Sequence, residues 1–361
     1  MKLKSIVIVF ALTILSSAFA KQGDTIVLSP DHPNQYVVKK GDTLWAIAET
    51  FLRDPWRWKD IWQGNDQIDN PDLIYPGDVI YLTEKNGQPV LSMRKSGENG
   101  ISLSASGPEG ANVKITPSIR QGDLSTPIPT IPMSVIGPFL SKPRVVTADS
   151  LDDAPYVVSF QEGHLLGGSN STVYVRNLPN NATTEYDIVR KGKPYRNHET
   201  SKILGYEALY VGKARLQRSG DPATFKLQST DRDARIGDRL IATGSEKGRF
   251  GIQPHIPTTN VHGSIIQVVD GVTQIGQHNI VVIDQGSKQG IEAGHVLSIF
   301  QSSDTVRDRV ISTAGELVKL PEEKAGLLMI FRTFDHVSFG LVMDATRALH
   351  IHDSVQTPPL Y

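Results

Sequence analysis

The hydrophobic pattern is clearest over residues 36–82, where it changes from alternating to helical and back. Apolar residues recur there at i, i+3, i+4 and i+7, the spacing that lines one face of a helix: Leu44, Ile47, Ala48 and Phe51. This spacing predicts a helix over residues 43–51. Asp42 or Thr43 would cap the helix through a side-chain oxygen, because Gly41 permits a tight turn just before it.

A second helix and a closing strand are predicted in the same stretch. Asp54 followed by Pro55 is a helix start signal, since proline at the first helical position gives up an amide that lacks a partner anyway. An apolar stripe follows at Trp58, Ile61 and Trp62, and residues 78–82 read as a strand. The predicted order is strand, helix, helix, strand, and the four tryptophans of the chain all fall within it.

This stretch resembles the LysM family of peptidoglycan-binding and chitin-binding modules. The resemblance is carried by Gly41-Asp42-Thr43-Leu44, Asn65, Pro71-Asp72-Leu73-Ile74 and Tyr75-Pro76-Gly77-Asp78. It implies a small βααβ module over residues 34–83. Only residues 52–59 look locally elaborated.

The family's ligand is a polymer of N-acetylated sugars, which offers amide donors, carbonyl acceptors and a methyl group. A shallow groove lined by free backbone amides suits it, and two loops of turn residues supply such amides. By resemblance, the glycan-binding residues are Gly41, Asp42, Thr43, Leu44, Asn70, Pro71, Asp72, Leu73 and Ile74. The alternative is that these residues only make turns. Most of the tryptophans are expected in the core, and only Trp45, off the apolar stripe of its helix, is expected to be an exposed aromatic.

The first residues predict export. Lys2 and Lys4 precede an apolar run over residues 6–15, and Ala18-Phe19-Ala20 is a small-x-small cleavage site, so residues 1–20 read as a signal peptide. Removing them changes the formal net charge from -1 to -3, which argues against a nucleic-acid partner. The chain has no cysteine, hence neither disulfides nor a lipid-modified N-terminal cysteine. We expect a periplasmic, cell-wall-associated protein.

After the module the chain becomes rich in Gly, Ser and Pro. Residues 84–155 read as a connector with short strands, including a brief apolar docking segment over residues 133–140. A Pro-rich connector is stiff and extended, so we expect the module to stand at some distance from the C-terminal region of the chain. That region shows little helical periodicity, and the predicted class is α+β: the βααβ module followed by a mostly-β region.

The β region repeats itself loosely. Residues 173–175 and 186–189 lie 108 positions before residues 281–283 and 294–297. In both copies a Gly-and-Asp turn precedes an alternating strand, although the second copy departs from the pattern with His352 where the first has Gly237. The repeat predicts two related small β-barrels, a first β unit at 156–245 and a second at 246–361.

A second resemblance covers nearly the whole chain. Residues 131–146, 154–158 and 203–240 are similar to the periplasmic LysM proteins that accompany the type IV pilus secretin, whose C-terminal part is similar to that of a flagellar outer-ring protein. The resemblance implies two partners: the N-acetylglucosamine-containing glycan strands of peptidoglycan, and the outer-membrane secretin ring.

Enzymatic readings find little support in the residues. The absence of cysteine excludes cysteine peptidases, and His350-Ile351-His352 lacks the carboxylate partner of a zinc peptidase. A lytic transglycosylase would need a helical domain that the pattern does not predict. We therefore expect a non-catalytic scaffold without cofactor or metal. The alternatives are a peptidoglycan hydrolase or hydrolase activator, or a flagellar outer-ring component.

Overall fold

The computed structural model describes residues 26–62, 74–85, 87–95, 127–140, 145–243, 252–269, 274–301, 305–308, 310 and 316–359. The expected signal peptide lies outside these ranges. Within them, no helix is both long enough and apolar enough to cross a bilayer.

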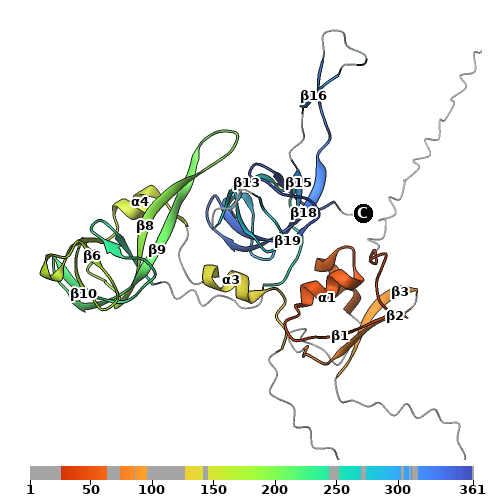
Figure 1. Ribbon diagram of the computed structural model, residues 1–361, viewed down its shortest axis with the longest axis horizontal. Coiled ribbons are helices and arrows are strands. Elements are labelled where there is room, and N and C mark those ends of the chain that lie inside the picture. The colour runs from red at the N-terminus through yellow and green to blue at the C-terminus, as the bar shows by residue number, and fades with distance from the viewer. Residues whose placement is uncertain are drawn as a thin grey trace, which may run out of the picture.

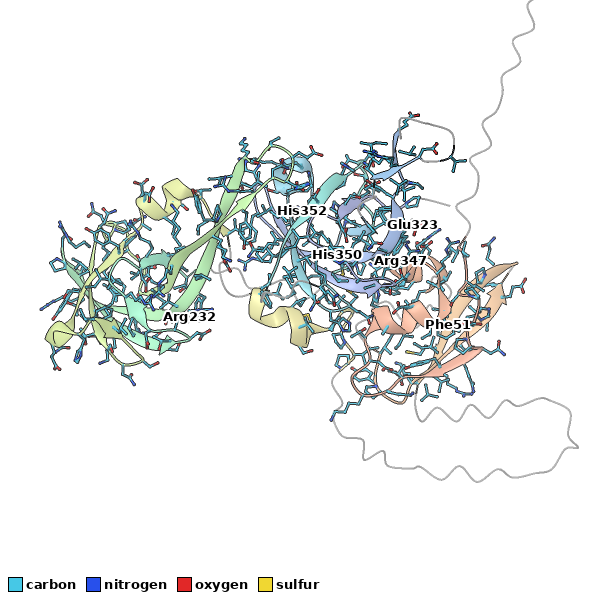
Figure 2. The ribbon with its side chains drawn as sticks, turned by 45° about the horizontal axis from the view of Figure 1, so that its top comes forward. Phe51, Arg232, Glu323, Arg347, His350 and His352 are labelled. Atoms are coloured by element: carbon cyan, nitrogen blue, oxygen red, sulfur yellow. The ribbon has the colours of Figure 1, made fainter. Side chains whose placement is uncertain are left out.

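The N-terminal module has the predicted order of elements (Figure 1). They are β1 (Gln35–Val37), α1 (Leu44–Phe51), the 3-10 helix η1 (Pro55–Arg57), α2 (Trp58–Trp62) and β2 (Val79–Lys85). Its core surrounds Phe51, labelled in Figure 2, which is fully buried. Trp58 and Trp62 pack edge to face beside it, with ring centroids 6.0 Å apart.

Thr43 and not Asp42 caps α1. The amide of Ala46 donates to the Thr43 hydroxyl over 3.2 Å. The Asp42 carboxylate instead accepts from the Lys39 amide at 2.8 Å and from the Tyr36 hydroxyl at 3.0 Å. Asp42 therefore fixes the turn before the helix, and of the two predicted caps the structure uses Thr43.

A third strand, β3 (Gln88–Arg94), continues the module's sheet into the range expected as connector. It pairs antiparallel with β2 across a turn at Gly87, whose φ is +76°. Leu91 of β3 is buried in the module core. An Asn-Gly pair between two apolar runs is a strong hairpin signal, and it was available in the sequence at residues 86–87.

The region beyond residue 155 is mostly β, as expected. The principal strands of the first β unit are β5 (Tyr156–Phe160), β7 (Thr172–Arg176), β8 (Glu185–Arg196), β9 (Ile203–Arg218), β10 (Ala223–Thr230) and β12 (Arg239–Ala242). Their sheet runs β10-β7-β5-β12-β8-β9-β4, with β4 (Val145–Val146) at one end, and β9 pairs with β10 as well. Shorter elements complete the unit: α4 (Ala148–Asp152), η3 (Gln161–Gly163), β6 (Leu166–Gly167) and β11 (Ala234–Arg235).

The second β unit is a closed barrel in the order β13-β14-β19-β18-β15-β20. Its strands are β13 (His262–Val268), β14 (Ile280–Ile283), β15 (Val296–Gln301), β18 (Glu323–Thr333), β19 (Ser338–Ala345) and β20 (Ser354–Gln356), with η4 (Ser287–Gln289) between β14 and β15. A hairpin of β16 (Thr305–Arg307) and β17 (Leu317–Lys319) projects from the barrel (Figure 1). The six principal strands of the first unit pair in the corresponding cyclic order.

Five turns among the described residues share one hydrogen-bond pattern. They span residues 75–78, 235–238, 276–279, 292–295 and 350–353. In each, the fourth side chain accepts from the first residue's amide, over 2.7 to 3.2 Å. The third residue is left-handed and donates its amide to a neighbouring strand, over 2.7 to 2.8 Å. The same turn thus starts a strand in the module and in both β units.

The fourth position of this turn accepts several residue types, provided that the side chain is a hydrogen-bond acceptor. Asp238 and Asp353 use a carboxylate, Asn279 an amide oxygen and His295 the ring Nδ1. At the third position of the 350–353 turn, His352 has φ +78°, which is uncommon for a residue with a Cβ. Its ring stacks on His198 from the β8–β9 hairpin, with centroids 3.8 Å apart. Figure 2 labels His350 and His352 on this loop.

The barrel is apolar on both faces. Inward side chains of β18 such as Leu328 and Ile330 join the barrel's own core. Outward side chains join a second cluster with residues from other parts of the chain, here called the shared apolar cluster: Trp45, Trp56, Ile131, Ile136, Tyr195, Ile280, Val282, Val296, Leu327, Met329, Phe331, Val337, Phe339, Leu341 and Met343. The module, α3 (Met133–Leu140) and the β8–β9 hairpin therefore cover the barrel wall.

Polar contacts also join the module and α3 to the second β unit. The Lys59 ammonium donates to the Gln253 side chain, and Arg332 donates to the carbonyl of Phe139 at the end of α3 over 2.8 Å. Burial, followed by the nearby Asp344, raises the pKa of Glu49 on α1. The expected separation between module and barrel is therefore wrong, because the apolar barrel wall needs the module as cover.

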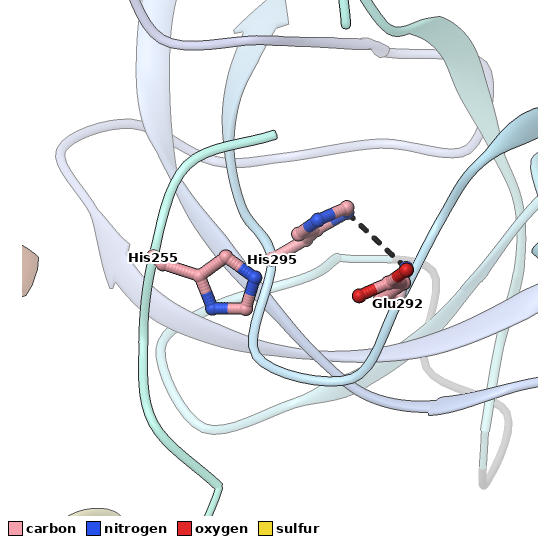
Figure 3. Close-up of side chains that lie close together, drawn as sticks. All are labelled: His255, Glu292 and His295. Carbon is pink, nitrogen blue, oxygen red and sulfur yellow. Dashed lines mark hydrogen bonds between the residues drawn. The ribbon is translucent and has the colours of Figure 1, made fainter. Parts of the chain in front are cut away.

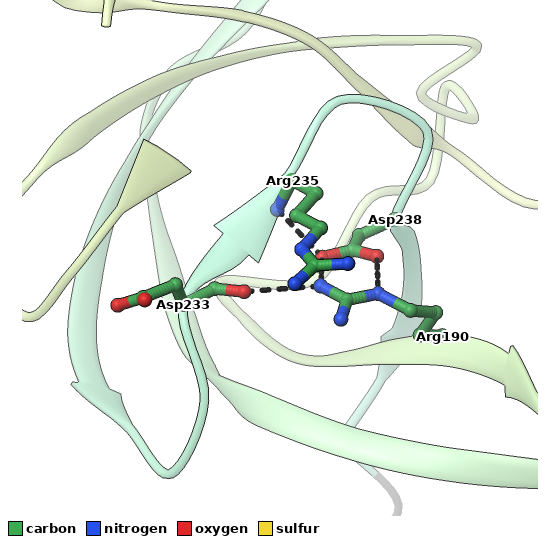
Figure 4. Close-up of polar contacts among 4 residues, drawn as sticks. All are labelled: Arg190, Asp233, Arg235 and Asp238. Atoms are coloured by element: carbon green, nitrogen blue, oxygen red, sulfur yellow. Dashed lines mark hydrogen bonds and ion pairs between the residues drawn. The ribbon is translucent and has the colours of Figure 1, made fainter. Parts of the chain in front are cut away.

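A partly buried ion pair joins β8 to the 235–238 turn in the first β unit (Figure 4). Arg190 of β8 donates to both oxygens of Asp238 over 2.7 and 2.8 Å, and Asp238 also accepts from the Arg235 amide. Asp238 is 2% exposed. A matched pair with similar geometry, Arg176 and Asp221, lies at the surface, with both side chains about half exposed.

Arg190→Met should lower the free energy of unfolding by about 3 kcal/mol, since it leaves the Asp238 carboxylate buried without its charged partner. Arg176→Met is the control. It breaks an exposed pair and should have a much smaller effect, because water replaces the lost contacts. Urea unfolding of both variants measures the difference. Equal losses would contradict a structural role for the partly buried pair.

The stability of the folded protein should depend on pH through His295 in the 292–295 turn. Burial, then the neighbouring His255, lower the pKa of His295 below its ordinary value of 6.5. As the pH falls through 6.5, the unfolded chain takes up a proton that the folded state resists, so stability is full above this pH and declines below it. His295→Asn keeps an acceptor in the turn, and its melting temperature should fall less between about pH 7.5 and 5.5. His164→Asn, at an exposed site, should keep the wild-type slope.

Candidate glycan-binding site

The first predicted glycan loop precedes α1. Gly41 has φ +96°, a conformation open to glycine at no steric cost, and its turn is closed by the bond from the Lys39 amide to Asp42. The amides of Leu44 and Trp45 lie in the first turn of α1, where no helical carbonyl precedes them. They therefore have no partner within the helix, which makes them donors of the kind that an amide-reading groove requires.

The second predicted loop is described only at its end. Ile74 is fully buried in the module core, and its carbonyl accepts a hydrogen bond from outside the loop. The Asp78 carboxylate, 3% exposed, accepts from the Tyr75 amide at 2.9 Å and holds the loop where it enters β2. The remaining predicted residues, Asn70, Pro71, Asp72 and Leu73, lie outside the described residues.

A segment of the connector passes between the two loops. The Ile128 amide donates to the Ile74 carbonyl at 2.9 Å. The Leu44 amide donates to Pro129, and the Trp45 amide to Thr130, each at 3.0 Å. Leu44 and Ile74 are thus linked through residues 128–130, which the composition assigns to the connector. The signal was present in the alternation Pro127-Ile128-Pro129-Thr130-Ile131-Pro132.

The expected exposed aromatic is wrong. Trp45 is 2% exposed and belongs to the shared apolar cluster. It does point away from the stripe formed by Leu44, Ile47 and Phe51, but the barrel covers that other face of α1. A half-buried aromatic lies beside the first loop instead. It is Tyr36, whose pKa is raised by burial and then by the bond to Asp42.

A histidine cluster in the second β unit has some of the features of a metal site (Figure 3). Ligand atoms of His255, Glu292 and His295 lie within 4.8 Å of one another. However, the Glu292 amide donates to His295 Nδ1 over 3.2 Å, so the neutral ring carries its proton on Nε2. That leaves His295 without a lone pair for a cation. The role of His295 is instead to accept the Glu292 amide in the shared turn pattern.

Comparisons with known proteins agree with the module's geometry. Residues 36–83 match the family model described as LysM domain. SpoIVD-associated factor A of Bacillus subtilis (strain 168) is 41% identical over 64 residues, which are 18% of this chain and 16% of that protein. Uncharacterized protein YqbP of the same organism is 36% identical over 61 residues, which are 16% of this chain and 28% of that protein. The matches thus span less than a third of either relative.

LysM domains bind the N-acetylglucosamine-containing glycans of peptidoglycan. The order of strands and helices, the turn at Gly41 and the turn at 75–78 all fit that family. Residues 36–83 of this chain form a LysM domain.

Proposed function

We propose that this chain is a non-catalytic periplasmic scaffold that binds peptidoglycan through its LysM domain and an envelope machine through its β units. The first half is supported by the match to the LysM family and by the two loops around Leu44 and Ile74, whose backbone amide and carbonyl groups bond to the same short segment, residues 128–130. The proposed glycan site comprises the predicted residues of both loops, from Gly41 to Leu44 and from Asn70 to Ile74.

The second half of the proposal concerns the partner. An exposed hairpin supports a macromolecular contact, because β16 and β17 carry apolar side chains that the barrel does not cover. Val306, Val310, Leu317, Val318 and Leu320 are between 41% and 93% exposed. Exposed apolar groups gathered on one projection are typical of a protein-binding surface. By the family resemblance of residues 131–146, 154–158 and 203–240, the partner we propose is the outer-membrane secretin ring of the type IV pilus.

The cyclic strand order supports a further part of the proposal, that the two β units are related copies of one barrel. Each of the six strand pairings in the first unit has a counterpart in the second. For example, β5–β7 corresponds to β13–β14, and β12–β5 corresponds to β20–β13. Gly237 and His352 occupy the same turn position with similar φ angles of +89° and +78°. A ring partner that repeats around an axis would present many LysM domains to one wall, which turns weak single contacts into firm attachment.

The mature chain should sediment with purified sacculi, and N-acetylglucosamine oligomers should compete. Removing residues 26–95 should abolish sedimentation, since that range holds both glycan loops and β3. Circular dichroism checks that the remaining β units stay folded. Undiminished sedimentation of the shortened chain would contradict the site. A cleared zone in a peptidoglycan zymogram would favour a wall hydrolase instead.

Val306→Ser with Leu317→Ser should reduce capture of solubilised secretin rings by about tenfold or more, because each change removes an exposed apolar contact at a protein interface. Leu165→Ser with Leu166→Ser is the matched control, since those side chains are 79% and 50% exposed on the first β unit. Ring capture is measured by co-purification from envelopes. Equal capture by both double variants would contradict the hairpin as partner surface, and no capture by wild type would contradict the partner.

A further inference from the structure

The strongest unassigned feature is the connector segment that bonds to both predicted glycan loops, between which the proposed LysM groove lies. Its three backbone hydrogen bonds join both predicted glycan loops to residues 128–130. The donors of the first loop and the acceptor of the second are the groups that a glycan would need. A groove whose amides already have partners offers a glycan nothing until those partners leave.

The segment presents the same chemical groups as an N-acetylated sugar. An acetamido group offers one N–H donor, one carbonyl acceptor and one methyl group. The segment offers the Ile128 N–H to Ile74, the Pro129 carbonyl to Leu44, and the apolar Ile128 side chain, which is 6% exposed within the domain core. A groove shaped for the one set of groups therefore accommodates the other.

Prolines prepare the segment for this role. Pro127, Pro129 and Pro132 hold the chain extended, and residues before proline avoid the helical region. An extended proline-rich chain makes no hydrogen bonds of its own, so its carbonyls are free to accept from the groove. Little conformational entropy is lost when such a segment is fixed, which favours its binding.

The segment is anchored at both ends. Ile128 lies in the core of the LysM domain, whereas Ile131, 2% exposed, lies in the shared apolar cluster against the barrel. Pro129 between them is exposed. A ligand attached to its own receptor acts at an effective concentration on the order of millimolar, so it competes strongly with a weakly binding glycan.

We propose that residues 128–130 are an intramolecular ligand of the LysM groove, and that a glycan strand binds only by displacing them. The inference rests on the proposed glycan site and adds a regulated state to it. The domain is closed when the segment is seated and open to peptidoglycan when the segment has left.

Ile128→Pro in the full mature chain tests the proposal. It removes both the amide that donates to Ile74 and the buried side chain, so the segment should leave the groove. Affinity for an N-acetylglucosamine oligomer, measured by calorimetry, should rise by about tenfold or more. Ser134→Ala is the control, because it alters an exposed side chain of α3 outside residues 128–130 and keeps all three hydrogen bonds of the segment. It should bind as wild type does.

A second measurement does not depend on that variant's folding. The chain has no cysteine, so Thr130→Cys gives a single thiol for maleimide labelling. Thr130 is half-buried in the seated segment, and saturating oligomer should raise the labelling rate several-fold. An unchanged rate despite measured oligomer binding would overturn the displacement proposal.

The outcomes separate the two proposals. Equal binding by wild type and a folded Ile128→Pro variant would overturn self-occupation while leaving the glycan site intact. Binding by neither, with both chains folded, would overturn the glycan site itself and with it the inference. Tighter binding by Ile128→Pro together with faster labelling of Thr130→Cys would support both.

Discussion

The rest of the structure depends on the burial of the barrel's outer wall. Antiparallel strands usually leave one face to water, but β14, β18 and β19 carry apolar side chains on both faces. Each large side chain removed from water contributes about 1.5 to 3 kcal/mol. Cover from other parts of the chain stabilises this wall. The LysM domain, α3 and the β8–β9 hairpin are therefore held on one surface.

Local turns prepare the strands for this packing. The shared four-residue turn uses a side-chain acceptor to fix its first amide and a left-handed third residue to reach a neighbouring strand. The requirement is an acceptor at a given position and not a particular residue, since Asp238, Asn279 and His295 all meet it. A histidine that looks like a metal ligand by proximity is thus explained by backbone hydrogen bonding.

Sequence reasoning recovered what is local. The stripe of α1, the start at Pro55 and the strand at 78–82 are properties of short stretches, and the structure has them. The burial of Trp45 against the barrel could not be predicted in the same way. The periodicity of one helix shows which face is apolar but not what covers the opposite face. The unbroken apolar runs at 280–283 and 327–331 do indicate that the outer wall of the barrel is covered, since strands buried on both faces lose their alternation of apolar and polar residues.

Residues 128–130 were expected to be part of a spacer, yet they bind to the module, for a related physical reason. Proline removes amide donors and keeps the chain extended, which makes a segment a good spacer. The same two properties leave carbonyls unpaired and lower the entropy cost of binding, which make it a good occupant of an amide-lined groove. Composition alone cannot separate the two roles. The apolar side chains of Ile128 and Ile131, between the prolines, favour the role of a bound segment. Both are buried in the folded protein, whereas a spacer that stays in water would gain no stability from them.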